Sequence, residues 1–115
     1  MDLILIISAR FNQRLTEIVY QQGMIPLVYS DMELALFAVR RTVFKAVLIN
    51  GQRNNIDVLE TALNLRDINS EIPILIVGMP ADEKQKKILE KLDRVQIVVD
   101  EDGMLEKIIQ QVRRS

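Results

Sequence analysis

The stretch KAVLINGQRNNID, residues 45–57, contains the clearest structural signal in the sequence. Four apolar residues, 46–49, run directly into Asn50 and Gly51. A short apolar run that ends in a polar residue and a glycine is typical of a buried parallel strand. We therefore predict a strand over 46–49, with the Asn50 side chain at the carboxyl end of a sheet.

Four further apolar runs alternate with amphipathic stretches along the chain. The five predicted strands cover residues 3–7, 25–29, 46–49, 72–77 and 96–99. A helical pattern, with apolar residues three or four positions apart, follows each of them. This alternation predicts a doubly wound α/β sandwich, (βα)5, in which a five-stranded parallel sheet has helices on both faces. In such sheets the ligand site lies beyond the carboxyl ends of the strands.

The starts and buried faces of several helices can also be predicted. Ser30 and Glu33 have the spacing of a capping box at the start of the second helix. Asp82 and Asp102 are the predicted N-caps of the fourth and fifth helices. The third helix is expected to begin near Ile56. The apolar residues expected to face inward on the first, third and fourth helices include Phe11, Leu59, Leu63, Ile88 and Leu89.

The composition of the 115 residues excludes several classes of function. The formal net charge of −1 gives no electrostatic attraction to nucleic acid or to anionic membranes. The chain has no Cys and no His, which excludes disulfides, thiolate chemistry, imidazole bases and the usual zinc ligands. No apolar segment reaches the roughly 18 residues of a membrane span, and no signal peptide is evident. We expect a single cytoplasmic domain without a metal or a cofactor.

The whole chain resembles the receiver domain of bacterial two-component response regulators. The resemblance is carried by FKAVLINGQRNNIDVLETALNLRDINSEIPILIVGM, residues 44–79, which looks like the middle third of that family. It implies a flavodoxin-like fold with strand order 2-1-3-4-5. It also implies one receiver-like domain over residues 1–115, which stands alone or forms the N-terminal part of a longer regulator.

The resemblance places neutral or acidic residues where the family carries out phosphorylation. Asn50 stands at the phosphorylated aspartate, Gly78 at the Ser or Thr of the switch, and Asp100 at the lysine. Ser8 and Ala9 stand near the paired acids that hold Mg²⁺. A neutral amide is a poor nucleophile, and Mg²⁺ needs several carboxylate oxygens. The resemblance therefore implies a degenerate pseudo-receiver that is not an enzyme.

Three residues at this end of the sheet have predicted roles of their own. We interpret Asn50 as a turn and hydrogen-bonding residue, because Asn followed by Gly tolerates unusual backbone angles. The alternative is that Asn50 contacts a ligand without covalent chemistry. Met79 is predicted to fill the empty phosphate pocket. Asn12 is interpreted as an ordinary helix cap, with anion binding alongside Ser8 and Arg10 as the alternative.

Two functions follow from these observations. The first is an atypical, phosphorylation-independent receiver that binds a protein partner or a second copy through the fourth helix, fifth strand and fifth helix. The resemblance gives the candidate contacts on that face as Lys84, Lys87, Lys91, Asp100, Glu101, Lys107 and Gln111. The alternative is a flavodoxin-like ligand sensor that binds a nucleotide or another anion near Ser8, Asn50, Arg53 and Gly78. Neither function involves direct contact with nucleic acid or with a membrane.

Overall fold

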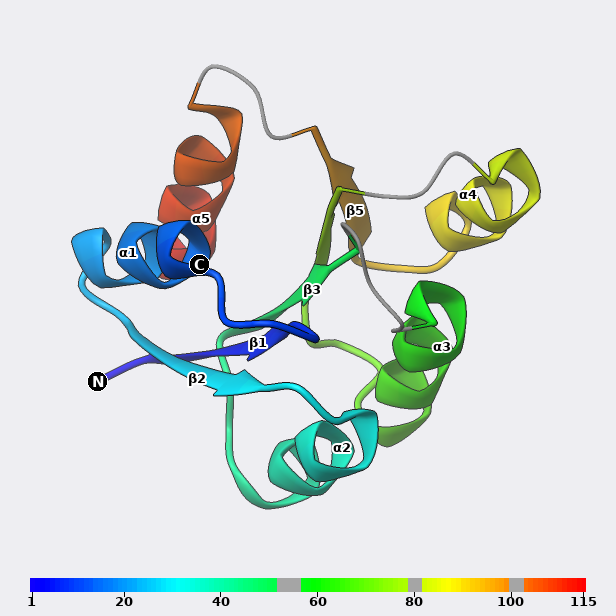
Figure 1. Cartoon of the computed structure of the whole chain (residues 1–115), viewed down its shortest axis with the longest axis horizontal. Helices are drawn as coiled ribbons and strands as arrows, with labels where there is room; N and C mark the ends of the chain where they lie inside the picture. Colours follow the sequence, from blue (N-terminus) through cyan, green and yellow to red (C-terminus); the bar gives the residue numbers. More distant parts are fainter. Residues whose placement is uncertain (52–56, 79–81, 100–102) are drawn as a thin grey trace.

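The structure is a computed structural model that describes residues 1–51, 57–78, 82–99 and 103–115. Five strands alternate with five helices along the chain (Figure 1). The strands are β1 (Leu3–Ile7), β2 (Ile25–Tyr29), β3 (Ala46–Asn50), β4 (Ile74–Val77) and β5 (Val95–Val98). The helices are α1 (Gln13–Gln21), α2 (Met32–Arg41), α3 (Val58–Ile68), α4 (Glu83–Glu90) and α5 (Met104–Arg114). The predicted (βα)5 alternation is confirmed.

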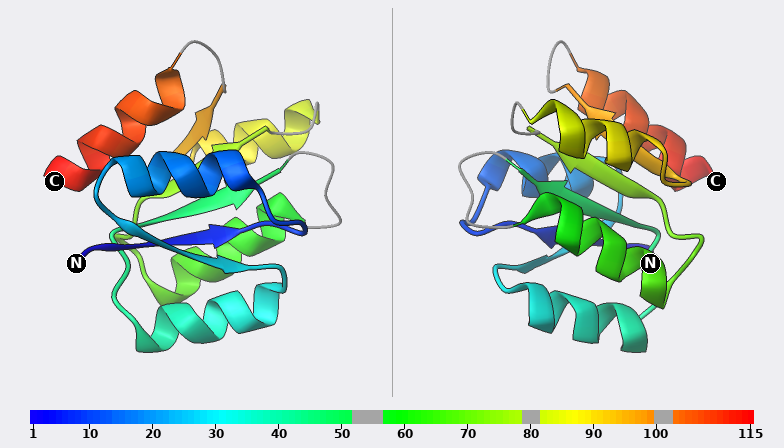
Figure 2. Two further views of the ribbon diagram at one scale, coloured as in Figure 1. Left: turned by 60° about the vertical axis from the view of Figure 1, so that its left-hand side comes forward. Right: turned by 90° about the vertical axis from the view of Figure 1, so that its right-hand side faces the viewer.

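All four strand pairs are parallel, and the sheet order is β2-β1-β3-β4-β5. Helices α1 and α5 cover one face of the sheet, and α2, α3 and α4 cover the other (Figure 2). Successive residues of β1 pack on opposite faces: Ile4 and Ile6 belong to the core beneath α1 and α5, and Leu5 and Ile7 to the other core. All five residues of β3 are buried, because β3 lies at the centre of a sheet that is covered on both faces.

The N-terminal caps agree with the sequence at some helices and differ at others. The carboxylate of Asp82 accepts hydrogen bonds from the backbone of Lys84 and Gln85, so the predicted cap of α4 is confirmed. At α2 the cap is Asp31 and not Ser30, because the Asp31 carboxylate accepts from the backbone nitrogen of Glu33 at 2.7 Å. Gly103 stands at the cap position of α5, while the predicted cap, Asp102, lies outside the described residues.

Three predicted strands have shifted bounds, and the smallest shift is that of β3, which extends by one residue to include Asn50. β4 begins at Ile74 and not at Ile72, because the backbone nitrogen of Ile72 donates to the side chain of Asn69 in the preceding turn. Pro73, the next residue, has no N–H to donate. β5 covers Val95–Val98 and therefore ends one residue earlier than predicted.

Some apolar side chains that were predicted to face inward are exposed. Phe11 precedes α1 and is exposed, and so are Leu63 on α3 and Ile88 on α4. On α3 the prediction holds in part: Leu59 is partly buried against the core, whereas Leu63 is exposed. The fully buried face is formed by Val58, Ala62 and Leu65. Within the described ranges, none of the helices is long and apolar enough to cross a membrane.

Candidate functional site

The carboxyl ends of β1 and β3 bring Ser8 and Asn50 together. Ile7 and Ile49 are neighbours in the parallel register, so the next residue of each chain lies at the same edge of the sheet. The Asn50 side-chain nitrogen Nδ2 donates to Ser8 Oγ at 3.1 Å. Ser8 is 1% exposed and Asn50 is 7% exposed, so water has little access to this hydrogen bond.

The Ser8 hydroxyl also fixes the following loop. Its hydrogen is donated to the carbonyl oxygen of Arg10, while its oxygen accepts from Asn50. The backbone nitrogen of Ser8 donates to the carbonyl oxygen of Tyr29, at the end of β2, at 3.0 Å. These bonds form a neutral network that links the ends of three adjacent strands.

Asn50 does not have the backbone conformation that was predicted for a turn residue. It is the last residue of β3 and pairs with Val77 in β4. Among the described residues other than glycine, only Arg94 has a positive φ. The predicted turn role is therefore wrong, whereas the predicted hydrogen-bonding role is observed.

Gly51 is required by the close approach of two strand ends. Its backbone nitrogen donates to the carbonyl oxygen of Val77 at 2.7 Å. A Cβ atom at position 51 would lie 2.9 Å from the carbonyl oxygen of Gly78, which is closer than a side chain tolerates. Gly78 itself has φ +71°, a conformation that favours glycine. The backbones of β3 and β4 therefore leave no space for a ligand between these two residues.

The described residues at the ends of β1, β3 and β4 that correspond to the family's site, Ser8, Ala9, Asn50 and Gly78, carry no charge. Ala9 contributes a methyl group and Gly78 has no side chain. The part of the chain that the structure describes contains no cluster of three His, Cys, Asp or Glu side chains that could hold a metal ion. The other residues predicted for this region, Arg53, Met79, Asp100 and Glu101, lie outside the described residues.

The start of α1 carries out the structural role expected of it. Asn12 is its N-cap, and the side-chain oxygen accepts from the backbone nitrogen of Leu15 at 3.1 Å. Thr16 donates through its hydroxyl to the Asn12 carbonyl oxygen at 2.7 Å. The Asn12 side chain thereby satisfies one of the backbone N–H groups that an anion could otherwise contact at the helix start.

The described residues predicted for the interaction face are all exposed. They are Lys84, Lys87 and Lys91 on or next to α4, and Lys107 and Gln111 on α5. Three apolar side chains on the same elements, Ile88, Val99 and Met104, are also exposed. Val99 and Met104 were not predicted as contacts. The exposure of Val99 could have been predicted from its position as the last residue of an apolar run on an edge strand.

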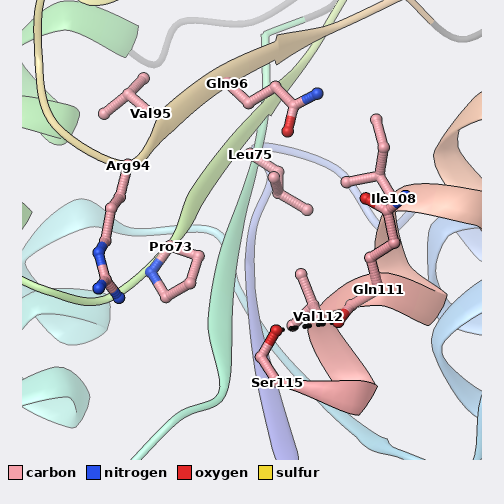
Figure 3. A pocket seen from close by; sticks show the side chains of 9 residues that line it. All are labelled: Pro73, Leu75, Arg94, Val95, Gln96, Ile108, Gln111, Val112 and Ser115. Carbon is pink, nitrogen blue, oxygen red and sulfur yellow. Dashed lines mark hydrogen bonds between the residues drawn. The ribbon is translucent and has the colours of Figure 1, made fainter.

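An open groove of about 500 Å³ lies between β5 and α5 (Figure 3). It is lined by Pro73 and Arg94, which precede β4 and β5, and therefore lies at the amino ends of the strands, away from Asn50. Gln96 projects from the β5 side and Gln111 from the α5 side. The groove gives the interaction face a recess with apolar and polar walls.

No family model matches the sequence, and no curated protein matches it either. Solved structures match over nearly the whole chain. One match is the receiver domain of a sensor histidine kinase from Pseudomonas aeruginosa, which has a magnesium ion in its active-site cleft. It is 17% identical to this chain with a TM-score of 0.77, and the match covers 99% of this chain and 98% of that chain. A two-component response regulator from Clostridium difficile is 13% identical with a TM-score of 0.82, covering 99% and 97%.

A third match belongs to a family of streptococcal redox sensors that evolved from two-component response regulators. It is 15% identical with a TM-score of 0.79, and the match covers 99% of this chain and 52% of that chain. These similarities show that the chain has the fold of response regulator receiver domains, with the strand order 2-1-3-4-5 that the resemblance implied.

Proposed function

We propose that this chain is a signalling module that binds another protein without being phosphorylated. The observation that carries the proposal is the buried hydrogen bond from Asn50 Nδ2 to Ser8 Oγ. It puts a neutral amide and a neutral hydroxyl at the edge where the resemblance expects a reactive carboxylate and its metal ligands. The streptococcal redox sensors support the idea that descendants of response regulators can acquire other inputs.

The residues present do not suit Mg²⁺. Phosphoryl transfer to a receiver needs an ionised carboxylate and a hard cation held by several oxygen ligands. The Ser8 hydroxyl already donates to Arg10 and accepts from Asn50, and Ala9 has no oxygen in its side chain. The magnesium ion in the Pseudomonas domain is thus a property of that protein.

The same contacts weaken the alternative of an anion or nucleotide sensor at this edge. The Ser8 hydroxyl and the Asn12 side chain are used within the fold. A rise in melting temperature with nucleotides or inorganic phosphate would restore the alternative, because ligands that bind only the folded state stabilise it.

The face formed by α4, β5 and α5 is the proposed binding surface. Lys84, Ile88 and Lys91 follow at positions i, i+4 and i+7, so they form one stripe along α4. A stripe with an exposed apolar side chain between two lysines suits a protein segment in which acidic residues flank an apolar one. The groove between β5 and α5 adds a recess for a side chain of that partner.

The phosphorylation part of the proposal is tested with Mg²⁺ and a small phosphodonor. Intact mass should show no stoichiometric adduct of one phosphoryl group on the wild-type chain. The variant Asn50→Asp should also remain unmodified, because the cation ligands are still missing. An acid-stable, base-labile adduct on the wild-type chain would refute this part.

The binding part is tested by affinity capture from an extract of the native cell. Lys84→Glu with Lys91→Glu should lose proteins that the wild-type chain retains. Arg10→Glu, which reverses an exposed charge before α1 and outside this face, is the control and should retain them. Equal retention by both variants would mean that the stripe on α4 is not the binding surface.

A further inference from the structure

The outer face of α2 exposes large apolar side chains. Leu34 is 58% exposed and Phe37 is 50% exposed, although α2 already buries Ala35, Ala38 and Val39 against the core. Leu34 and Phe37 are three residues apart and therefore lie on the same side of the helix. The guanidinium carbon of Arg41 lies 4.1 Å from the centre of the Phe37 ring, which holds the ring in a defined position.

This face of α2 carries negative charge at one end of the helix and positive charge at the other. Glu33 lies in the first turn, and Arg40 and Arg41 lie in the last turn. If a second α2 is laid antiparallel on the first, with the twofold axis near Phe37, each Glu33 faces Arg40 and Arg41 of the other helix. The two helix dipoles are then also antiparallel, which is the favourable arrangement.

We propose that α2 is a surface through which two copies of this chain associate. The two Phe37 rings would meet near the twofold axis, the Leu34 side chains would flank them, and Glu33 would pair with the arginines of the other copy. A twofold contact requires one surface that is complementary to itself, and the charge order of α2 meets this requirement. The charge complementarity therefore favours a second copy over a different protein as the occupant.

This association goes beyond the proposed binding of a partner and uses a different surface. α2 lies beside the β2 edge of the sheet, whereas α4 and α5 flank the β5 edge (Figure 1). The dimer would leave the face formed by α4, β5 and α5 open. Because α2 has 10 residues and is about 15 Å long, the contact is small compared with the ~1,600 Å² of a typical stable complex, and we expect a weak dimer.

The first test is sedimentation velocity of the whole chain over a wide range of concentrations. We expect a reversible monomer–dimer equilibrium whose dissociation constant rises about tenfold or more in Phe37→Glu, since central aromatic residues dominate such contacts. Ile88→Glu, an equally exposed change on α4, should leave the equilibrium unchanged. A monomer at every concentration, or a dimer lost in Ile88→Glu and retained in Phe37→Glu, would overturn the proposal.

Charge exchange tests the antiparallel arrangement itself. Glu33→Arg alone and Arg40→Glu alone should each weaken the dimer, because like charges then face one another. The double variant should recover part of the lost affinity, since the pair with position 40 is restored with its signs exchanged while Arg41 is unchanged. Failure of the double variant to recover would overturn the antiparallel arrangement.

A cross-link gives an independent test, because the chain has no native Cys. Phe37→Cys places two thiols near the twofold axis, so mild oxidation should give a disulfide-linked dimer on a non-reducing gel. Val99→Cys, an exposed position at the end of β5, is the control and should remain monomeric. Efficient cross-linking of Val99→Cys without cross-linking of Phe37→Cys would overturn the proposal, without affecting partner binding through α4.

Discussion

Replacing Asn50 by Asp tests the buried network at the edge of the sheet most directly. The change removes the Nδ2 donor and places a carboxylate where the side chain is 7% exposed. The Ser8 hydroxyl could turn to donate to the new group, but the Arg10 carbonyl oxygen would then lose its donor. The loss of one hydrogen bond and the burial of a charged group together should lower the free energy of unfolding by about 2–3 kcal/mol at neutral pH.

The loss in the free energy of unfolding caused by Asn50→Asp should be larger at high pH than at low pH. Burial raises the pKa of the new carboxyl in the folded state above the value of about 3.9 in the unfolded chain. The full penalty is therefore present above the folded-state pKa. The part of the cost that comes from burying the charge decreases as pH falls through that pKa and is absent below the unfolded value, because the neutral acid is then present in both states.

Urea unfolding followed by circular dichroism provides the measurement. The difference in the free energy of unfolding between the wild-type chain and Asn50→Asp should be largest near pH 8 and should shrink towards pH 4. Asn50→Ala is the control, since it loses the hydrogen bond without adding a charge and should show a difference that does not vary with pH. A stability equal to that of the wild-type chain across this range would refute the account of the buried pair.

Two further predictions concern stability, and urea unfolding checks both. Gly51→Ala should cost more than Gly23→Ala, because the new Cβ would meet the Gly78 backbone oxygen at 2.9 Å. At Gly23 only the positive φ is unfavourable, at about 1–2 kcal/mol. A smaller loss at Gly51 would contradict the close approach. Arg66→Met should cost about 1 kcal/mol, because Arg66 Nη1 donates to the carbonyl oxygen of Asn69 at 3.0 Å. An unchanged stability would contradict a net stabilising contribution of the Arg66 guanidinium group.

Arg66 also shows how partial burial acts on a charged side chain. Desolvation lowers its pKa from the ordinary value, while the nearby Asp93 carboxylate acts in the opposite direction. Among the described side chains, its Nε is a buried polar atom without a hydrogen-bond partner. The methionine variant removes both the donor at Nη1 and this unsatisfied group, which is why only a modest loss is expected.

The fold could be predicted from the sequence because apolar and amphipathic stretches alternate regularly along the chain. Continuous apolar strands alternate with amphipathic helices, and β3 is as fully buried as its four apolar residues indicated. The buried face of α3 was predicted only in part, because this helix carries two adjacent apolar stripes, one with Leu59 and Leu63 and one with Val58, Ala62 and Leu65. The second stripe packs on the sheet, and the helical spacing alone does not decide between them. Leu63 therefore became exposed, although its spacing from Leu59 fits a helical stripe.

The position of the candidate site could be predicted from the sequence, but the contacts between its side chains could not. The sequence placed Ser8 and Asn50 at the same edge of the sheet, because both follow apolar strands. Their hydrogen bond depends on the register of β1 with β3, which the sequence does not specify. Asn followed by Gly is a common turn signal, but here the glycine serves the contact with Gly78 and the asparagine remains in the strand. Tertiary packing prevailed over local turn preference.

On the proposed function, this module changes its state through differences in binding and not through phosphorylation. A partner shifts a conformational equilibrium only as far as its affinities for the two states differ. The α2 surface and the face of α4, β5 and α5 lie towards opposite edges of one sheet, so the simplest coupling between them is bivalency and not a change of shape. In that case Phe37→Glu, which weakens the dimer, should also weaken capture of a partner that presents two binding segments. The affinity for a partner with a single segment should be unchanged. A weaker affinity for the single segment as well would instead show that dimerisation alters the binding face itself.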